Sequence, residues 1–409
     1  MERKSTINST LFQRDFLSVL IVVVNAFSWY FPLYIFFEST LGNLQIDSTF
    51  FQAAFGVHFA TAIGAAIIGT ALVKKFPSRE SFLAVWMFIG SIASVSMIML
   101  DTVNLVQVFL ISFLLGAALG FGFPTCLAYF GDYSTIENRG LLGGVTFFAS
   151  GLFILFIGLL LSFSTSVVVG ALLLAAWRGI GLLSFLLARQ KQDYQKEEAI
   201  EVSYRSVLQD RSFILYLLPW IMFCITNFLE RPIVNVILGE DFASFVPIAE
   251  YGIGGFVALI GGWFADSVGR KRIVIVGFIM LGIGYAVLGL FPPMDIIWYL
   301  YIILDAVAWG IFSLMFYLVV WSELAGNRVK EKYYLIGVLP FLVAGYIPIL
   351  FTPYAKDVAV SVAFSLASFF LFLAVLPLLY TAETMPQKQI ELKRLRKYVE
   401  AAKKAKEKK

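Results

Sequence analysis

An acidic residue lies near the middle of a long apolar stretch, where a carboxyl group is rarely found. Asp305 lies within the run from Tyr301 to Gly310. Loss of hydration favours the neutral form of a carboxyl group there, so Asp305 can hold a proton and release it when water arrives. We therefore expect Asp305 to act in proton coupling or substrate binding; the alternative is a structural hydrogen bond between helices. Glu250, in the outer part of another apolar run, is a similar candidate unless it reaches the lipid headgroups.

A second group of polar residues precedes a proline. Glu230, Arg231 and Pro232 are adjacent toward the end of an apolar run. Because proline disrupts a helix, we expect a break at this point. The Glu–Arg pair then either lines a gated cavity or lies at the water interface. Asn227, one turn earlier, is a candidate cavity residue, and Trp309 could stack on a ring-shaped substrate.

Single polar residues also occur in the first half of the chain. His58, the only histidine, is either a proton carrier or a structural hydrogen-bonding group. Arg178 either pairs with a neighbouring group or water, or binds an anion. No second histidine or cysteine accompanies His58, so we expect no metal site. The two cysteines, Cys126 and Cys224, are interpreted as packed thiols.

A short charged loop separates two apolar runs at residues 262–272. It contains Gly262, Asp266 and Gly269, and ends with three cations, Arg270, Lys271 and Arg272. Glycine lets two helices approach closely, an aspartate can accept hydrogen bonds from a helix N-terminus, and arginine can bind a carboxylate. The spacing therefore predicts a loop that contacts neighbouring helices at the membrane surface.

The composition identifies the elements that carry these residues. Of the 409 residues 60% are hydrophobic and 14% are charged, whereas soluble domains have about 45–50% apolar and about 25% charged residues. Runs of about 20 apolar residues predict membrane-spanning helices. We expect an all-α integral membrane protein with twelve such helices, at residues 15–37, 50–73, 82–100, 104–130, 140–163, 166–188, 212–238, 245–265, 272–291, 296–321, 334–352 and 358–381.

The distribution of lysine and arginine predicts the orientation. If the N-terminus is cytoplasmic, 28 of the 31 cations lie on the cytoplasmic side and only Lys356 lies in an outer loop. Cytoplasmic loops carry this excess in membrane proteins. We expect a multi-pass protein of the cell membrane with both termini in the cytoplasm. The net charge of +4 then reflects orientation, and nucleic acid is not an expected partner.

Equivalent residues recur at a nearly constant distance along the chain. Gly69 and Gly262 are 193 residues apart, and Asp101 and Asp295 are 194 apart. Such offsets predict two pseudo-symmetric six-helix halves. We assign residues 1–188 and 212–382 to these halves, 189–211 to a cytoplasmic linker, and 383–409 to a basic cytoplasmic tail. The tail either forms an interfacial helix or is solvated.

The charged loop resembles the signature of the major facilitator superfamily of secondary transporters. This resemblance implies that Asp266 lies against the start of the fifth helix, near Gly140, and that Arg270 faces Glu323 at the end of the tenth. These contacts would close the cytoplasmic side. In the corresponding loop of the first half, Val73 occupies the position of the aspartate, so we expect this lock to be lost there.

A second element is similar to loops of sugar porters, organic-ion transporters and metabolite symporters. Asp132 and Arg139 follow the acidic-then-Arg-Gly pattern of those families, and Glu323 begins a looser match. Many sugar porters have an aspartate in the first helix that binds the proton. This sequence has no such aspartate, and its nearest polar residue in the middle of that helix is Asn25. The fifth helix lacks the Gly-Pro motif of drug antiporters, which disfavours that activity.

The resemblance implies transport by alternating access. We expect proton-coupled symport of a small polar metabolite, a sugar or an organic acid, with Asp305 as proton carrier. The alternatives are an uncoupled facilitator, an exporter, or a sensor or assembly protein of the same fold. We expect a monomer in the lipid bilayer that needs no cofactor. No nucleophile–base or metal constellation indicates an enzyme.

Overall fold

The computed structural model describes residues 14–44, 46–101, 104–164, 166–189, 199–243, 245–291, 294–385, 391, 395 and 399. Within these residues the fold is all-α, with a single backbone bridge between Ile200 and Arg328. The predicted basic tail lies almost wholly outside the described residues, as do much of the linker and the first 13 residues.

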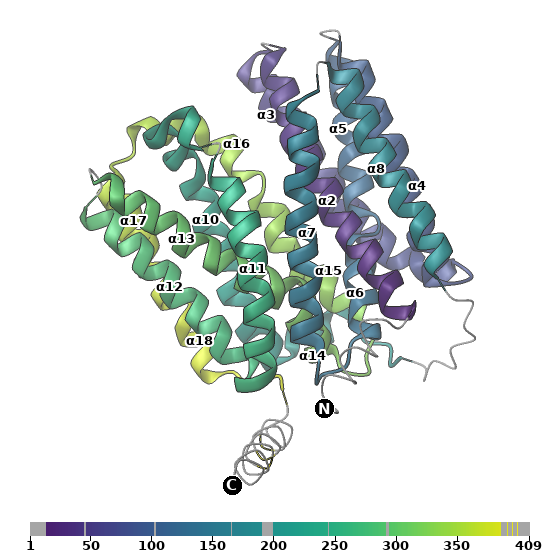
Figure 1. Cartoon of the computed structure of the whole chain (residues 1–409), viewed down its shortest axis with the longest axis vertical. Helices are drawn as coiled ribbons and strands as arrows, with labels where there is room; N and C mark the ends of the chain where they lie inside the picture. Colours follow the sequence, from purple (N-terminus) through teal and green to yellow (C-terminus); the bar gives the residue numbers. More distant parts are fainter. Residues whose placement is uncertain are drawn as a thin grey trace, which may run out of the picture.

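The first half of the chain forms one bundle (Figure 1, purple to teal). Its helices are α2 (Arg14–Asn43), α3 (Ser48–Leu72), α4 (Arg79–Ser96), α5 (Leu105–Gly120), α6 (Phe123–Tyr133), α7 (Arg139–Ser162) and α8 (Val167–Ala188). A short helix, α9 (Tyr204–Gln209), follows in the linker.

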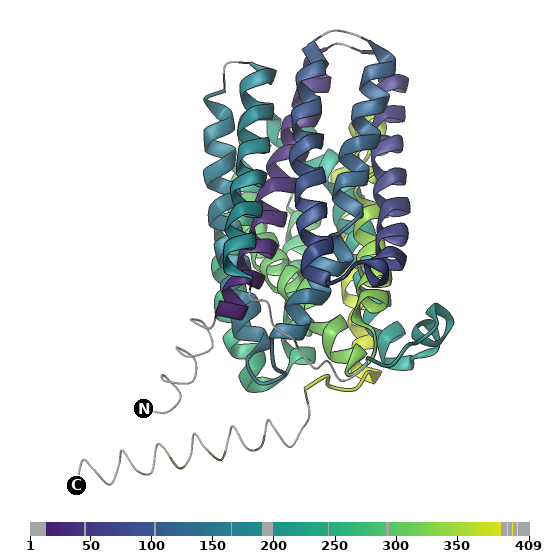
Figure 2. The same cartoon turned by 90° about the vertical axis from the view of Figure 1, so that its right-hand side faces the viewer.

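The second half forms a bundle beside the first (Figure 1), and it lies behind the first half in the view of Figure 2. Its helices are α10 (Arg211–Ala243), α11 (Phe245–Val268), α12 (Arg270–Leu290), α13 (Asp295–Phe312), α14 (Val320–Ala325), α15 (Lys330–Ala344), α16 (Ile347–Phe351), α17 (Val360–Leu373) and α18 (Val375–Tyr380). A π-helical segment, Ser313–Val319, connects α13 to α14.

The described residues contain twelve helical stretches long and apolar enough to cross a membrane, six in each half. They occur in the order predicted from the sequence, so the protein is a multi-pass membrane protein. The largest difference at the C-terminal end of a stretch is at the first, which extends to Asn43, six residues beyond the predicted boundary. This extension carries Glu38 into the helix.

The predicted break at Pro232 is wrong. α10 runs without interruption from Arg211 to Ala243 and contains both Pro219 and Pro232. A proline removes one backbone donor, but neighbouring helices and local adjustments can satisfy the freed groups in a membrane bundle. α2 likewise continues through Pro32.

The two halves pack closely along α7 and α11. A Cβ atom on Gly144 would lie 2.5 Å from the carbonyl oxygen of Ala258, and one on Gly262 would lie 2.1 Å from the carbonyl oxygen of Gly140. Only glycine allows this approach of the two backbones. The contact holds the halves together beside the cavity described below.

The loops after α3, α6, α11 and α14 lie at one end of the bundle, which we call the basic end. It comprises residues 73–78, 134–138, 269 and 326–329. The other end, which includes the turns after α2 and α16, is called the opposite end.

Candidate functional site

A cavity of about 380 Å³ lies between the two halves. Residues of α2, α3, α7, α10, α11, α13, α15 and α16 line it, together with the π-helical segment. Its wall reaches Glu38 near the end of α2 and Thr352 after α16, both toward the opposite end. The cavity therefore extends from the interior toward the opposite end. Six of the predicted residues line it: Asn227, Glu230, Arg231, Glu250, Asp305 and Trp309.

Asp305 forms part of a carboxyl pair in this cavity. Its side chain is almost completely buried, at 1% exposure. It accepts a hydrogen bond of 3.2 Å from the amide nitrogen of Asn227 and interacts electrostatically with Glu250 of α11, which lines the same cavity. Repulsion between two neighbouring carboxylates in a site shielded from water favours a proton on one of them. The arrangement can therefore hold a proton between α11 and α13.

Glu230 belongs to a hydrogen-bonded group that adjoins Asp305. Its two carboxylate oxygens accept hydrogen bonds from the hydroxyl groups of Tyr285 and Tyr301. The amide of Asn227 also donates to the hydroxyl of Tyr285, at 3.2 Å. Asn227 thus connects Glu230 to Asp305. The sequence analysis missed both tyrosines, because their partners come from other helices.

Arg231 projects into the cavity, where its side chain is exposed. It interacts electrostatically with Glu38 of α2 and Glu250 of α11. Glu38 was also missed, because the apolar run that predicted the first helix ends before it. Trp309 lines the wall nearby and packs against Phe223, with ring centroids 5.0 Å apart.

Asn25 and Arg178 lie outside the cavity lining, inside the first bundle. The fully buried guanidinium of Arg178 donates to Asn25 Oδ1 at 2.7 Å. It also lies between two indole rings, 4.6 Å from the centroid of Trp29 and 4.3 Å from that of Trp86. These cation–π contacts and the hydrogen bond join α2, α4 and α8. This geometry gives Arg178 a role in packing within the first half.

His58 lies behind the cavity wall. Its ring is buried among aromatic side chains, including Tyr30, Tyr34 and Phe59, with centroid distances of 6.3, 6.2 and 5.1 Å. Those three neighbours line the cavity, whereas His58 does not. His58 therefore reaches the cavity only through its neighbours.

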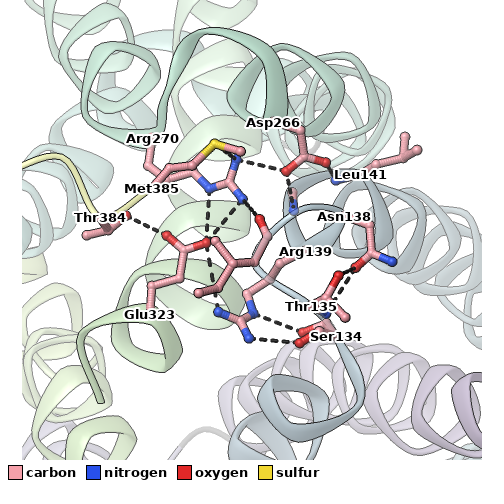
Figure 3. Close-up of polar contacts among 12 residues, drawn as sticks. Ser134, Thr135, Asn138, Arg139, Leu141, Asp266, Arg270, Glu323, Thr384 and Met385 are labelled. Atoms are coloured by element: carbon pink, nitrogen blue, oxygen red, sulfur yellow. Dashed lines mark hydrogen bonds and ion pairs between the residues drawn. The ribbon is translucent and has the colours of Figure 1, made fainter. Parts of the chain in front are cut away.

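At the basic end, a buried network joins the two halves (Figure 3). Asp266 accepts hydrogen bonds from the backbone N–H groups of Gly140, at 3.0 Å, and Leu141, at 2.9 Å. This is the position beside α7 that the family resemblance implied. The carboxylate interacts favourably with the N-terminus of that helix.

Arg270 connects this contact to Glu323. Its guanidinium lies 2.8 Å from Asp266 and 3.1 Å from Glu323, and the side chains of Arg270 and Glu323 are fully buried. Arg139 of the first half lies 3.8 Å from Glu323. The opposite charges and their hydrogen bonds offset part of the cost of burying the network, and the loss of one partner leaves a buried charge unpaired.

The loop conformation depends on Gly269, whose φ is 107°. A Cβ atom there would lie 2.4 Å from the carboxylate of Glu383. That carboxylate accepts backbone N–H bonds from Arg270 at 2.7 Å and from Lys271 at 3.2 Å. The side chain of Lys271 donates to the carbonyl of Thr381 at 2.9 Å. Arg272 is exposed.

The first-half loop lacks the aspartate contact, as Val73 predicts, but a residue beside the loop contacts the second half. Arg79, just after this loop, forms ion pairs with Asp132 of its own half and Glu331 of α15. Lys330 reaches Asp132 at 2.7 Å. Val73 has no carboxylate and so cannot make the contact that Asp266 makes. Instead, Arg79 of the first half and Glu331 at the start of α15 form an ion pair between the halves.

The linker adds an exposed connection at the same end. Glu201 forms ion pairs with Lys74 of the first half and with Lys332 of the second. The hydrogen bond from Lys74 is the main cause that holds the pKa of Glu201 below its ordinary value, and Lys332 adds to it. Next to Glu201, the backbone of Ile200 pairs with Asn327 and Val329.

The chain is similar to a known protein family and to solved structures. A family model described as Major Facilitator Superfamily matches residues 18–322. No curated protein sequence matches the chain. A solved structure of the proton:xylose symporter XylE, bound to 6-bromo-6-deoxy-D-glucose, superposes with a TM-score of 0.66 at 15% identity, covering 92% of this chain and 98% of XylE. FucP in the outward conformation gives a TM-score of 0.62 at 13% identity, covering 91% of this chain and 100% of FucP.

Proposed function

Because the chain belongs to the major facilitator superfamily, we propose that it is a secondary transporter that carries a sugar across the cell membrane together with protons. The observation that carries this proposal is the cavity between the halves, where the carboxyl groups of Glu250 and Asp305 lie beside amide, hydroxyl and aromatic groups. Such groups suit a hydroxylated solute, and the carboxyl pair suits a proton.

The charges of the cavity favour a sugar over an organic acid. Glu38, Glu230, Glu250 and Asp305 line it, whereas Arg231 is the one cation among its described lining residues. An anion would meet several carboxylates at close range, which is unfavourable in a site shielded from water. The resemblance of the fold to XylE, described as a proton:xylose symporter, is consistent with this choice.

The position of the network at the basic end supports the proposal of alternating access. We take this end as cytoplasmic, in agreement with the distribution of lysine and arginine. In the present state Asp266, Arg270 and Glu323 close it, while the cavity wall extends to the opposite end. Substrate release to the cytoplasm requires these contacts to break. The protein is proposed to work as a monomer in the bilayer.

Uptake into proteoliposomes tests the proposal. We expect labelled pentoses or hexoses to accumulate when the outside is made more acidic, and accumulation to disappear when a protonophore collapses the gradient. Saturable uptake that does not depend on the proton gradient would indicate a facilitator. Absence of saturable transport of any sugar would contradict the proposed substrate class.

A further inference from the structure

Four aromatic rings form the floor of the cavity on the side of the basic end. In each of α2, α7, the π-helical segment and α15, the lining residue nearest to that end is aromatic: Phe27, Phe147, Tyr317 and Phe341. The ring of Tyr317 packs against the other three, with centroid distances of 5.5, 6.1 and 5.4 Å. Each half contributes two rings, so a substrate that enters from the opposite end meets this aromatic floor at the bottom of the cavity.

The hydroxyl of Tyr317 is the one polar side-chain group of this floor, and it has no hydrogen-bond partner among the described residues. Its ring neighbours cannot supply one. Phenylalanine carries no acceptor, and the nearby Trp220 has only an N–H, which already donates to the carbonyl of Gly337 at 2.8 Å. Buried polar groups are almost always hydrogen-bonded, because an unpaired one is costly. The position of Tyr317 at the cavity therefore points to a partner that arrives with the substrate.

A second polar group on the same wall is also without a partner. The indole N–H of Trp309 forms no hydrogen bond within the part of the chain that the structure describes. Trp309, Ser313 and Tyr317 are spaced four residues apart and all line the cavity. The last two belong to the π-helical segment, and π-helical turns occur frequently at functional sites. Two unpaired groups along one wall indicate a ligand that carries several oxygen atoms.

We propose that the hydroxyl of Tyr317 binds one hydroxyl group of the transported sugar and determines specificity for it. This inference rests on the proposed transport of a sugar. A phenol can donate to a sugar oxygen or accept from a sugar hydroxyl. Because Tyr317 is 1% exposed in the present state, a neighbouring ring has to turn as the sugar arrives, and such rotamer changes are common on binding. A sugar that lacks the matching hydroxyl leaves the phenol unpaired and binds more weakly.

Competition among sugar analogues tests this recognition. Uptake of labelled D-glucose and D-xylose into proteoliposomes is inhibited by the unlabelled parent sugar or by each of its single-deoxy analogues. For the wild type, at least one analogue should require about tenfold more than the parent sugar for half inhibition, because it leaves the hydroxyl of Tyr317 unpaired. Tyr317→Phe should reduce this ratio to about one and leave the ratios of the other analogues unchanged.

The melting temperature in detergent without sugar separates a binding role from a structural one. Tyr317→Phe should leave it unchanged or raise it, because the variant removes a buried hydroxyl that has no partner. The matched control is Tyr129→Phe, which removes a buried hydroxyl that is hydrogen-bonded to Ser18 Oγ at 3.2 Å, outside the cavity lining. This control should lower the melting temperature and keep the wild-type ratios of inhibition.

Equal ratios for every analogue in Tyr317→Phe and the wild type would overturn the assignment. A fall in the melting temperature of Tyr317→Phe as large as that of Tyr129→Phe would also overturn it, because the hydroxyl would then have a structural partner. If the wild type transports no sugar, the proposed function fails, whereas the melting temperatures still decide whether the hydroxyl of Tyr317 is unpaired before a substrate binds.

Discussion

Replacement of Asp266 by asparagine should open the basic end. The carboxylate accepts two backbone N–H bonds, of 3.0 and 2.9 Å, and pairs with Arg270 at 2.8 Å, in a position that is only 3% exposed. Asparagine keeps one acceptor oxygen, loses the charge, and leaves Arg270 with Glu323 as its remaining acidic partner. A hydrogen bond to a charged group contributes about 1.5–3 kcal/mol. We therefore expect the closed state to lose about 2 kcal/mol, which is about a 30-fold change in the opening equilibrium.

Labelling of a reporter cysteine that replaces Ser322 measures this change, because Ser322 is 1% exposed and faces Gly131 across the halves at the basic end. Cys126 and Cys224 are buried and are replaced by alanine in the parent protein, so that the reporter is the single reactive thiol. If opening limits labelling, Asp266→Asn should raise the rate by about 30-fold. Asp357→Asn removes a charge at the opposite end and should leave the rate unchanged. The same rate in Asp266→Asn and the parent would refute the view that this carboxylate holds the basic end closed.

Three further predictions concern the proton site, the linker and the packing of the halves. Asp305→Asn should abolish sugar accumulation driven by a proton gradient but spare exchange of internal for external sugar; retained accumulation would exclude Asp305 as the carrier. Glu201→Gln should raise reporter labelling less than about fivefold, because exposed ion pairs contribute about 0–1 kcal/mol. Since the pKa of Glu201 is lowered, its ion pairs contribute above the ordinary pKa of a glutamate and are lost only as the pH falls through the lowered value. The ratio of labelling rates between Glu201→Gln and wild type should therefore be constant from about pH 8 to 6, and a steep change in that interval would contradict the assignment. Gly144→Ala should lower the melting temperature in detergent, because its Cβ atom would lie 2.5 Å from the carbonyl oxygen of Ala258, and overpacking typically costs about 1–3 kcal/mol. Gly158→Ala in the same helix, which has open space around it, should not lower it; equal effects of the two changes would show that contact with α11 is not the cause.

Much of the architecture could be predicted from local patterns. Runs of apolar residues determine which segments cross a membrane, and they placed the twelve helices within a few residues. The contact between Asp266 and the start of α7 could be anticipated because the loop resembles that of the major facilitator superfamily, which implies this position for the aspartate. Asp305 was identifiable because a carboxyl group within an apolar run is unusual.

Other features depend on the way helices from distant parts of the chain meet. Tyr285 and Tyr301 look like ordinary aromatic residues until Glu230 is placed between them. Glu38 follows the apolar run of the first helix, so hydrophobicity alone put it outside the membrane. The continuity of α10 through Pro232 depends on contacts with neighbouring helices, and the effect of proline on its own helix does not reveal these contacts.

The most direct test of the account is the flow of protons during sugar transport. Liposomes that contain the purified protein and a trapped pH-sensitive dye are diluted into buffer with one pentose or hexose at a time, with no initial gradient. We predict acidification of the lumen with at least one sugar, and none with the Asp305→Asn variant. Saturable sugar uptake without any change in internal pH would contradict proton coupling and leave Asp305 as a structural residue.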